Sequence, residues 1–160
     1  DVVLLSGGSS AGMRDHTVDI FLSMPESALL VHGAAISPGK PFILARSGRK
    51  CLMGLPGHVS SALVCARAFL SPLLRHLQGG EAPVVPGVQA VLSRAVASAQ
   101  GRRDFIRVKL SRTEEGWVAD PVTAPSGLIS GLVVADALVV CPENSEGLYA
   151  GQEVFAELLD

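Results

Sequence analysis

Three short segments rich in glycine or proline hold the residues of this chain that are best suited to bind an anion. Ser6 to Gly12 contains three glycines and three serines in seven residues, and Pro38-Gly39-Lys40-Pro41 and Leu55-Pro56-Gly57 follow later in the chain. Glycines allow the backbone to approach a ligand closely and to turn its N–H groups toward it. Each segment alone is also compatible with a tight turn, so the prediction of a phosphate site depends on whether the three segments meet.

Three side chains beside these segments could supply charge or a polar contact. Lys40, between two prolines, is suited to a phosphate, although a solvated lysine is an open alternative. Asp15 follows the first segment and is either a helix cap or a carboxylate that holds Mg²⁺ beside a phosphate. His58 precedes a predicted helix and either contacts an anion or is an exposed loop residue.

The first half of the chain alternates between strands and helices, which can bring the three segments together. Strands are predicted over residues 1–5, 29–32, 42–45 and 51–54, and helices over residues 17–24 and 60–77. Pro72 is expected to kink the second helix or to start a new turn. The three segments follow predicted strands, and open α/β sheets bind ligands at the carboxyl ends of their strands. We therefore expect one anion site at one edge of the sheet.

The first predicted strand, residues 1–5, is apolar on both faces. Such strands belong inside parallel sheets that helices cover on both sides. A buried strand at the first residue predicts that its neighbours in the sheet are missing. We therefore expect the chain to be a fragment of an α/β domain.

The second half of the chain has a different pattern. A stretch rich in glycine and proline, from Gln78 to Pro86, predicts a boundary between two domains, residues 1–78 and 79–160. Beyond it apolar residues repeat with a period of two, which is typical of a small β barrel or sandwich. The predicted strands are residues 88–92, 105–110, 117–119, 137–140 and 153–158.

Composition indicates a well-packed globular protein, because 48% of the residues are hydrophobic and 18% are charged. The net charge of −2 gives no reason to expect a nucleic-acid partner. No apolar run reaches the roughly 20 residues that a bilayer requires, and no signal peptide opens the chain. Three widely spaced cysteines with apolar neighbours predict buried thiols in a reducing compartment. We expect a cytoplasmic protein without a membrane partner.

The three segments, in this order, resemble those of the molybdopterin molybdenumtransferases, the family of MoeA and of the gephyrin E domain. In the first half the resemblance includes Asp15 and Ser61-Ala62-Leu63. The second half agrees in a series of short motifs. These are Gly101-Arg102 with Phe105 and Arg107, Ser126-Gly127 with Ser130, Ala135-Asp136, Pro142-Glu143, Gly147 and Gly151.

The resemblance implies the later part of a three-layer α/β/α molybdopterin-binding domain, followed by a small all-β, barrel-like C-terminal domain. It also implies insertion of molybdate into adenylylated molybdopterin, with release of AMP, by a homodimer that uses Mg²⁺. The fragment alone is expected to be inactive. The resemblance assigns the catalytic and metal-binding role to Asp15. It assigns pterin binding to Ser6, Gly7, Gly8, Ser9, Gly12, Pro38, Gly39, Lys40, Pro56, Gly57, His58 and Ser61.

Several positions depart from the usual pattern of that family. Met13 stands in place of an acidic residue, Gly33 and Ser37 in place of basic residues, and His58 and Val59 in place of an asparagine and a proline. A lost charge-assisted contact costs about 1.5–3 kcal/mol. The alternative to an enzyme is therefore a divergent, non-catalytic pterin-binding or scaffolding module that retains the fold.

Overall fold

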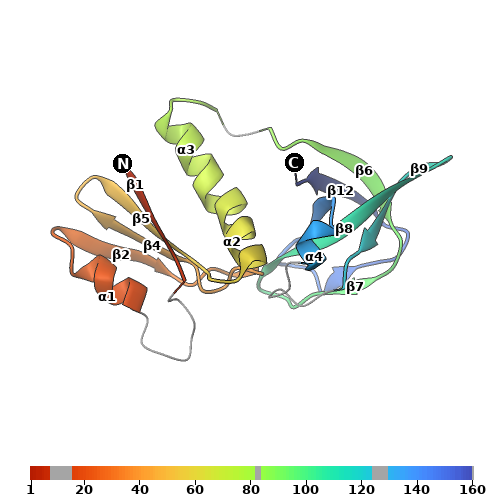
Figure 1. The fold of residues 1–160 in the computed structure, drawn as a ribbon. Helices are drawn as coiled ribbons and strands as arrows, with labels where there is room; N and C mark the ends of the chain where they lie inside the picture. Colours follow the sequence, from red (N-terminus) through yellow and green to blue (C-terminus); the bar gives the residue numbers. More distant parts are fainter. Residues whose placement is uncertain (8–15, 82–83, 124–129, 160) are drawn as a thin grey trace. The chain divides into compact units, whose positions relative to one another are not determined.

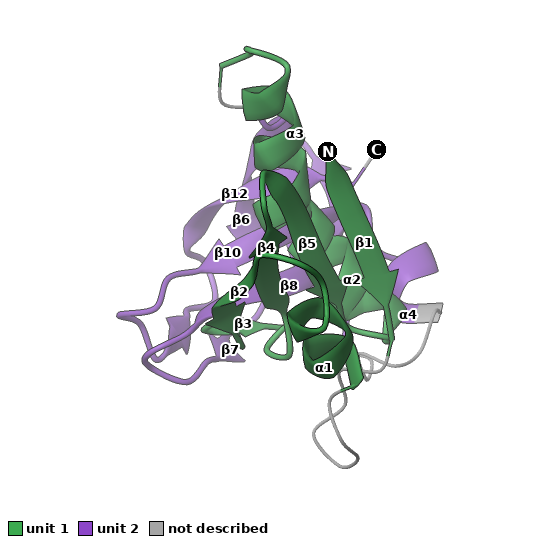
Figure 2. Ribbon diagram, turned by 90° about the vertical axis from the view of Figure 1, so that its left-hand side faces the viewer, with its two compact units in different colours: residues 1–82 green, residues 83–160 purple. Residues whose placement is uncertain are grey.

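The structure is a computed structural model that describes residues 1–7, 16–81, 84–123 and 130–159. The chain divides into two compact units, residues 1–82 and 83–160, which are green and purple in Figure 2. Each unit has its own buried hydrophobic cluster.

A four-stranded mixed sheet forms the centre of the first unit (Figure 1). Strand β1 (Val2–Ser6) pairs in parallel with β5 (Lys50–Leu55), and β4 (Ile43–Ser47) pairs antiparallel with both β5 and β2 (Ser27–His32). The four predicted strands are thus confirmed. A short strand, β3 (Ile36–Ser37), lies between β2 and β4 in the chain.

Helix α1 (His16–Leu22) covers one face of this sheet. Its Phe21 is 1% exposed and packs in a cluster with Ile43, Ala45 and Leu52. Ala45 lies opposite Leu52 in the β4–β5 register, so both side chains point to the face that α1 covers.

A long helical stretch covers the opposite face, behind the sheet in the view of Figure 2. It consists of α2 (Val59–Cys65), a π-helical segment η1 (Ala66–Leu70) and α3 (Ser71–Leu77). Phe69 of this stretch stacks on Phe42, with 4.3 Å between the ring centroids. The first unit is therefore a three-layer α/β/α arrangement, as predicted.

Pro72 explains the change of helix type. A proline has no N–H group, and its ring clashes with the carbonyl four residues earlier. The preceding turn widens, so that the Ser71 N–H donates to the Ala66 carbonyl, five residues back. A new α-helix then begins at Ser71, with Pro72 in its first turn. The prediction that Pro72 starts a new turn is confirmed.

Strand β1 differs from the prediction of a strand buried on both faces. In the described part of the chain it pairs with β5 alone, at the edge of the sheet. Val3 and Leu4 are 39% and 43% exposed as a result.

The second unit is a closed five-stranded barrel. Its strands have the order β10-β12-β6-β9-β8, and the pairing of β10 with β8 closes the barrel. The pair β6–β9 is parallel and the other pairs are antiparallel. The five strands are β6 (Gly87–Leu92), β8 (Arg103–Thr113), β9 (Gly116–Pro121), β10 (Ala137–Cys141) and β12 (Glu153–Leu158), each at a predicted place.

Small and branched side chains fill the barrel, including Val108, Ala119, Val139, Cys141 and Ala156, all at most 1% exposed. Three shorter elements complete the unit. They are β7 (Val96–Ala97), which pairs with β11 (Gly147–Leu148), and the short helix α4 (Ser130–Val133). Of the helices that the structure describes, none has the length and apolar character needed to cross a membrane.

Candidate functional site

The direction of the strands brings the described parts of the three predicted segments to one edge of the first sheet. Strand β4 is antiparallel to both β5 and β2, so β2 runs in the same direction as β5 and its parallel neighbour β1. The register aligns Leu5, Gly54, Ile43 and His32 in one row across the sheet, near this edge. The chain segments after β1, β2 and β5 therefore leave the sheet on the same side.

The first and third segments touch through their backbones. The Gly7 N–H donates to the Leu55 carbonyl at 3.1 Å, and a Cβ atom on Gly57 would lie 3.5 Å from the Gly7 Cα. Gly7 has a φ of +92°, which favours glycine. The hydroxyl of Thr17, in the first turn of α1, donates to the Gly7 carbonyl at 3.3 Å. This hydrogen bond holds the end of β1 against α1.

The second segment packs against α2. Gly39 is buried, and the Cys65 Sγ donates to its carbonyl at 3.6 Å. A Cβ atom on Gly39 would lie only 2.6 Å from Ile36 Cδ1 and 2.9 Å from Cys65 Sγ. The chain from Ala34 to Lys40 forms a closed loop, because the Ala34 N–H donates to the Lys40 carbonyl at 2.9 Å. Lys40 itself is exposed.

The start of α2 lies directly after the third segment. His58 occupies the N-cap position with an extended backbone, and its side chain is exposed and makes no capping hydrogen bond. Pro56, Ser60 and Ser61 are buried, so these residues belong to the packing beneath the edge. Val59, in contrast, is 48% exposed in the first helical turn.

Part of the predicted site lies outside the described residues. Gly8, Ser9, Gly12 and the predicted metal ligand Asp15 belong to residues 8–15. Among the residues that the structure describes, there is no group of three or more His, Cys, Asp or Glu side chains that could hold a metal ion.

In the second unit, the two arginines that follow Gly101 form salt bridges. Arg102 Nε lies 2.8 Å from Asp104 Oδ1, and the Ser98 hydroxyl donates to Asp104 Oδ2 at 2.9 Å. Arg103 Nη2 lies 3.2 Å from Glu143 Oε2. The pKa of Glu143 is lowered by a hydrogen bond from its own backbone N–H and by Arg103. Ser126 and Gly127 lie outside the described residues.

The contact of Cys65 with Gly39 was not predicted from the sequence, since the two residues are 26 positions apart. Burial raises the pKa of the Cys65 thiol to about 11. The folded state therefore holds a proton on Cys65 that the unfolded state loses at a pH of about 8.5–9.

We expect the stability of the protein to fall as the pH rises from about 9 to 11, by up to about 3 kcal/mol from Cys65 alone. Urea unfolding at a series of pH values measures this slope. Cys65→Ala should remove this contribution, so the difference in unfolding free energy between wild type and variant should shrink with rising pH. Cys51→Ala is the control and should keep most of the slope. If the unfolding free energies of wild type and Cys65→Ala changed in parallel with pH, the attribution of the slope to Cys65 would be wrong.

Comparisons with known proteins cover both units. Residues 1–76 match the family described as a probable molybdopterin binding domain, and residues 89–159 match the MoeA C-terminal region (domain IV). The molybdopterin molybdenumtransferase of Haemophilus influenzae is 30% identical over 160 residues, and that of Staphylococcus aureus is 28% identical over 155 residues. These alignments cover 98% and 96% of this chain.

The chain spans only 39% and 37% of the length of these two curated relatives. Among solved structures, the molybdopterin biosynthesis MoeA protein of Pyrococcus horikoshii is 36% identical, with a TM-score of 0.79. That match covers 99% of this chain and 37% of the other. From the matches in both units and the similar fold, we conclude that this chain belongs to the MoeA family of molybdopterin molybdenumtransferases and corresponds to its C-terminal portion.

Proposed function

We propose that this chain takes part in molybdenum cofactor biosynthesis and that the edge of its first sheet binds the phosphate end of molybdopterin. The observation that carries the proposal is the meeting of the segments after β1, β2 and β5 at one edge. The match of residues 1–76 to a family described as molybdopterin binding supports the identity of the ligand.

The described residues have the properties that a phosphate site requires. Gly7 and Gly57 lie side by side without side chains, so a phosphate can approach the backbone closely. Lys40 follows the buried Gly39 and provides a full positive charge at an exposed position. The contact of Gly39 with Cys65 holds this part of the chain against α2, which limits the positions that Lys40 can reach.

The finer chemistry belongs to the proposal as well. We infer that a longer protein with this chain inserts molybdate into adenylylated molybdopterin and releases AMP, as a homodimer. This chain would neutralise the phosphate charge and orient the pterin. Mg²⁺ would offset further phosphate charge. Its predicted ligand, Asp15, lies outside the described residues. The described residues contain no group of three or more His, Cys, Asp or Glu side chains that could hold a metal ion, so we assign no step to Mg²⁺.

Replacing Lys40 tests the site. We expect Lys40→Gln to weaken molybdopterin binding about 10- to 100-fold, because a charge-assisted contact contributes about 1.5–3 kcal/mol. Isothermal titration calorimetry of the chain with molybdopterin measures this change. Lys50→Gln is the matched control, because Lys50 is exposed at the start of β5, the far end of the strand from the site. Equal affinities of the two variants would contradict the role of Lys40.

One observation favours the second candidate, a non-catalytic pterin-binding or scaffolding module. The exposed apolar side chain of Val59 opens α2 at the edge where the phosphate would lie, and it offers no hydrogen bond. A full-length protein that binds molybdopterin without inserting molybdenum would support a pterin-binding module, and one that does not bind it would support a scaffold.

A further inference from the structure

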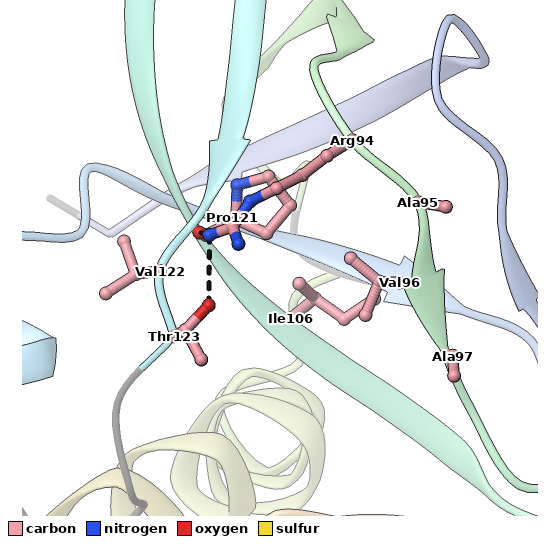
Figure 3. Close-up of a pocket in the computed structure, with 8 residues that line it drawn as sticks. All are labelled: Arg94, Ala95, Val96, Ala97, Ile106, Pro121, Val122 and Thr123. Carbon is pink, nitrogen blue, oxygen red and sulfur yellow. Dashed lines mark hydrogen bonds between the residues drawn. The ribbon is translucent and has the colours of Figure 1, made fainter.

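The second unit contains a pocket of about 600 Å³ in the wall of the barrel (Figure 3). It lies between the connection from β6 to β7 and the end of β9, and all the residues that line it belong to this unit. None of them belongs to the site proposed for molybdopterin.

The pocket exists because two paired strands separate. Strands β6 and β9 pair as far as Leu92 and Ala119, and the Ser93 N–H still donates to the Ala119 carbonyl at 3.0 Å. Beyond this point β7 pairs with β11, whereas the Val122 N–H donates to the Arg107 carbonyl at 2.8 Å. The two segments follow different partners, and the space between them is left open.

Apolar side chains form the walls of this space. Val96 from β7 and Ile106 from β8 point toward one another in Figure 3, and Val122 lies on the other side. All three are only half-buried. Volumes of about 300–1,000 Å³ with mostly apolar walls and few polar groups are typical of sites for small molecules.

Arg94 crosses the opening and gives the pocket its charge. Its Nη2 donates to the Pro121 carbonyl and, at 3.0 Å, to the Thr123 hydroxyl, so the guanidinium is held in place. Its Nε lies 3.6 Å from Asp120 Oδ1, but both side chains are more than half exposed. Ion pairs in such surroundings are weak. Within the described part of the chain Nη1 has no acceptor, so its two N–H groups are available to a ligand.

We propose that this pocket binds a small molecule that has an apolar body and one carboxylate. A guanidinium matches the geometry of a carboxylate, and the apolar body would cover Val96 and Ile106. A phosphate would fit less well, because its additional charged oxygens would face apolar walls without donors. This ligand site is independent of molybdopterin, so the two proposals fail or succeed separately.

An NMR titration of the ¹⁵N-labelled chain with 3-phenylpropionate tests the proposal. We expect saturable shifts of the amide signals of residues 94–97, 106, 122 and 123. The neutral analogue 3-phenylpropan-1-ol has the same apolar body and should bind about tenfold more weakly or worse, because it lacks the charge. Equal binding of the two compounds would overturn the proposal, as would the absence of saturable shifts up to about 10 mM.

Two variants distinguish binding by Arg94 in the pocket from a general effect of the positive charge of the unit. Arg94→Gln should weaken 3-phenylpropionate binding about tenfold or more. Arg103→Gln removes the same charge at a similar exposure, from a residue that pairs with Glu143 and does not line the pocket, and it should leave binding unchanged. Unaltered binding by Arg94→Gln, or equal losses in both variants, would overturn the role of Arg94. The comparison of acid and alcohol in the wild type needs no variant and stands even if a variant fails to fold.

Discussion

Gly39→Ala is expected to lower the free energy of unfolding of the first unit by about 3 kcal/mol. The added Cβ atom would lie 2.6 Å from Ile36 Cδ1 and 2.9 Å from Cys65 Sγ, and both neighbours are buried. Overpacking of this kind costs about 1–3 kcal/mol, and the φ of +128° adds backbone strain of similar size in a residue other than glycine. Urea unfolding, followed by circular dichroism, measures the loss.

Two controls separate the crowding from the backbone strain. Gly79→Ala also introduces a side chain at a positive φ, +75°, but its Cβ would meet no atom within 4 Å, so a loss of only about 1 kcal/mol is expected. Adding Cys65→Ala to Gly39→Ala removes one of the two crowded atoms and should recover part of the lost stability. Equal losses for Gly39→Ala and Gly79→Ala, with no recovery in the double variant, would show that the second segment is not packed against α2 as described.

Asp15→Asn is expected to reduce molybdenum insertion about 100-fold in a full-length protein that carries this chain. This prediction depends on the proposed function, since the resemblance to the family assigns the catalytic and metal-binding role to Asp15. Asparagine keeps the size of the side chain and its ability to cap a helix, so the variant removes only the negative charge. The assay measures molybdenum cofactor formed from adenylylated molybdopterin and molybdate.

The control for this variant is Asp19→Asn. Asp19 is an exposed carboxylate in the first turn of α1, and its replacement removes the same charge four residues away. It should leave insertion unchanged. If Asp15→Asn retained full activity, or if both variants lost it equally, the specific role of Asp15 would be wrong.

Much of the local structure was predictable because local patterns decide it. The apolar runs and their turn residues placed β2, β4 and β5 within one or two residues, and the period of two placed the five barrel strands. Pro72 marked the start of α3, because a proline affects its own turn wherever it occurs in a helix. The motifs also identified the family, since residue types and their order are properties of the sequence.

The candidate site was predictable only in outline. The sequence showed which segments could bind an anion, and the idea that they share an edge followed from a general rule for α/β sheets. It did not show that Gly7 lies beside Gly57, that the Cys65 thiol donates to the Gly39 carbonyl, or that the Thr17 hydroxyl donates to the Gly7 carbonyl. The partners in each of these contacts are at least ten residues apart in the chain.

The exposure of the β1 side chains and the closure of the barrel likewise depend on the tertiary structure. The apolar residues of β1 suggested a buried strand, yet Val3 and Leu4 are partly exposed, because exposure depends on which strand lies alongside. The choice between barrel and sandwich depended on the pairing of β10 with β8, and the pocket beside Arg94 depends on where β6 and β9 separate. Periodicity specifies which side of a strand is apolar, but strand partners and registers are set by contacts between distant segments. The residue types and order of Ser6 to Gly12, Pro38 to Pro41 and Leu55 to Gly57 were therefore evident from the chain alone, whereas only the folded sheet placed their described parts at a common edge.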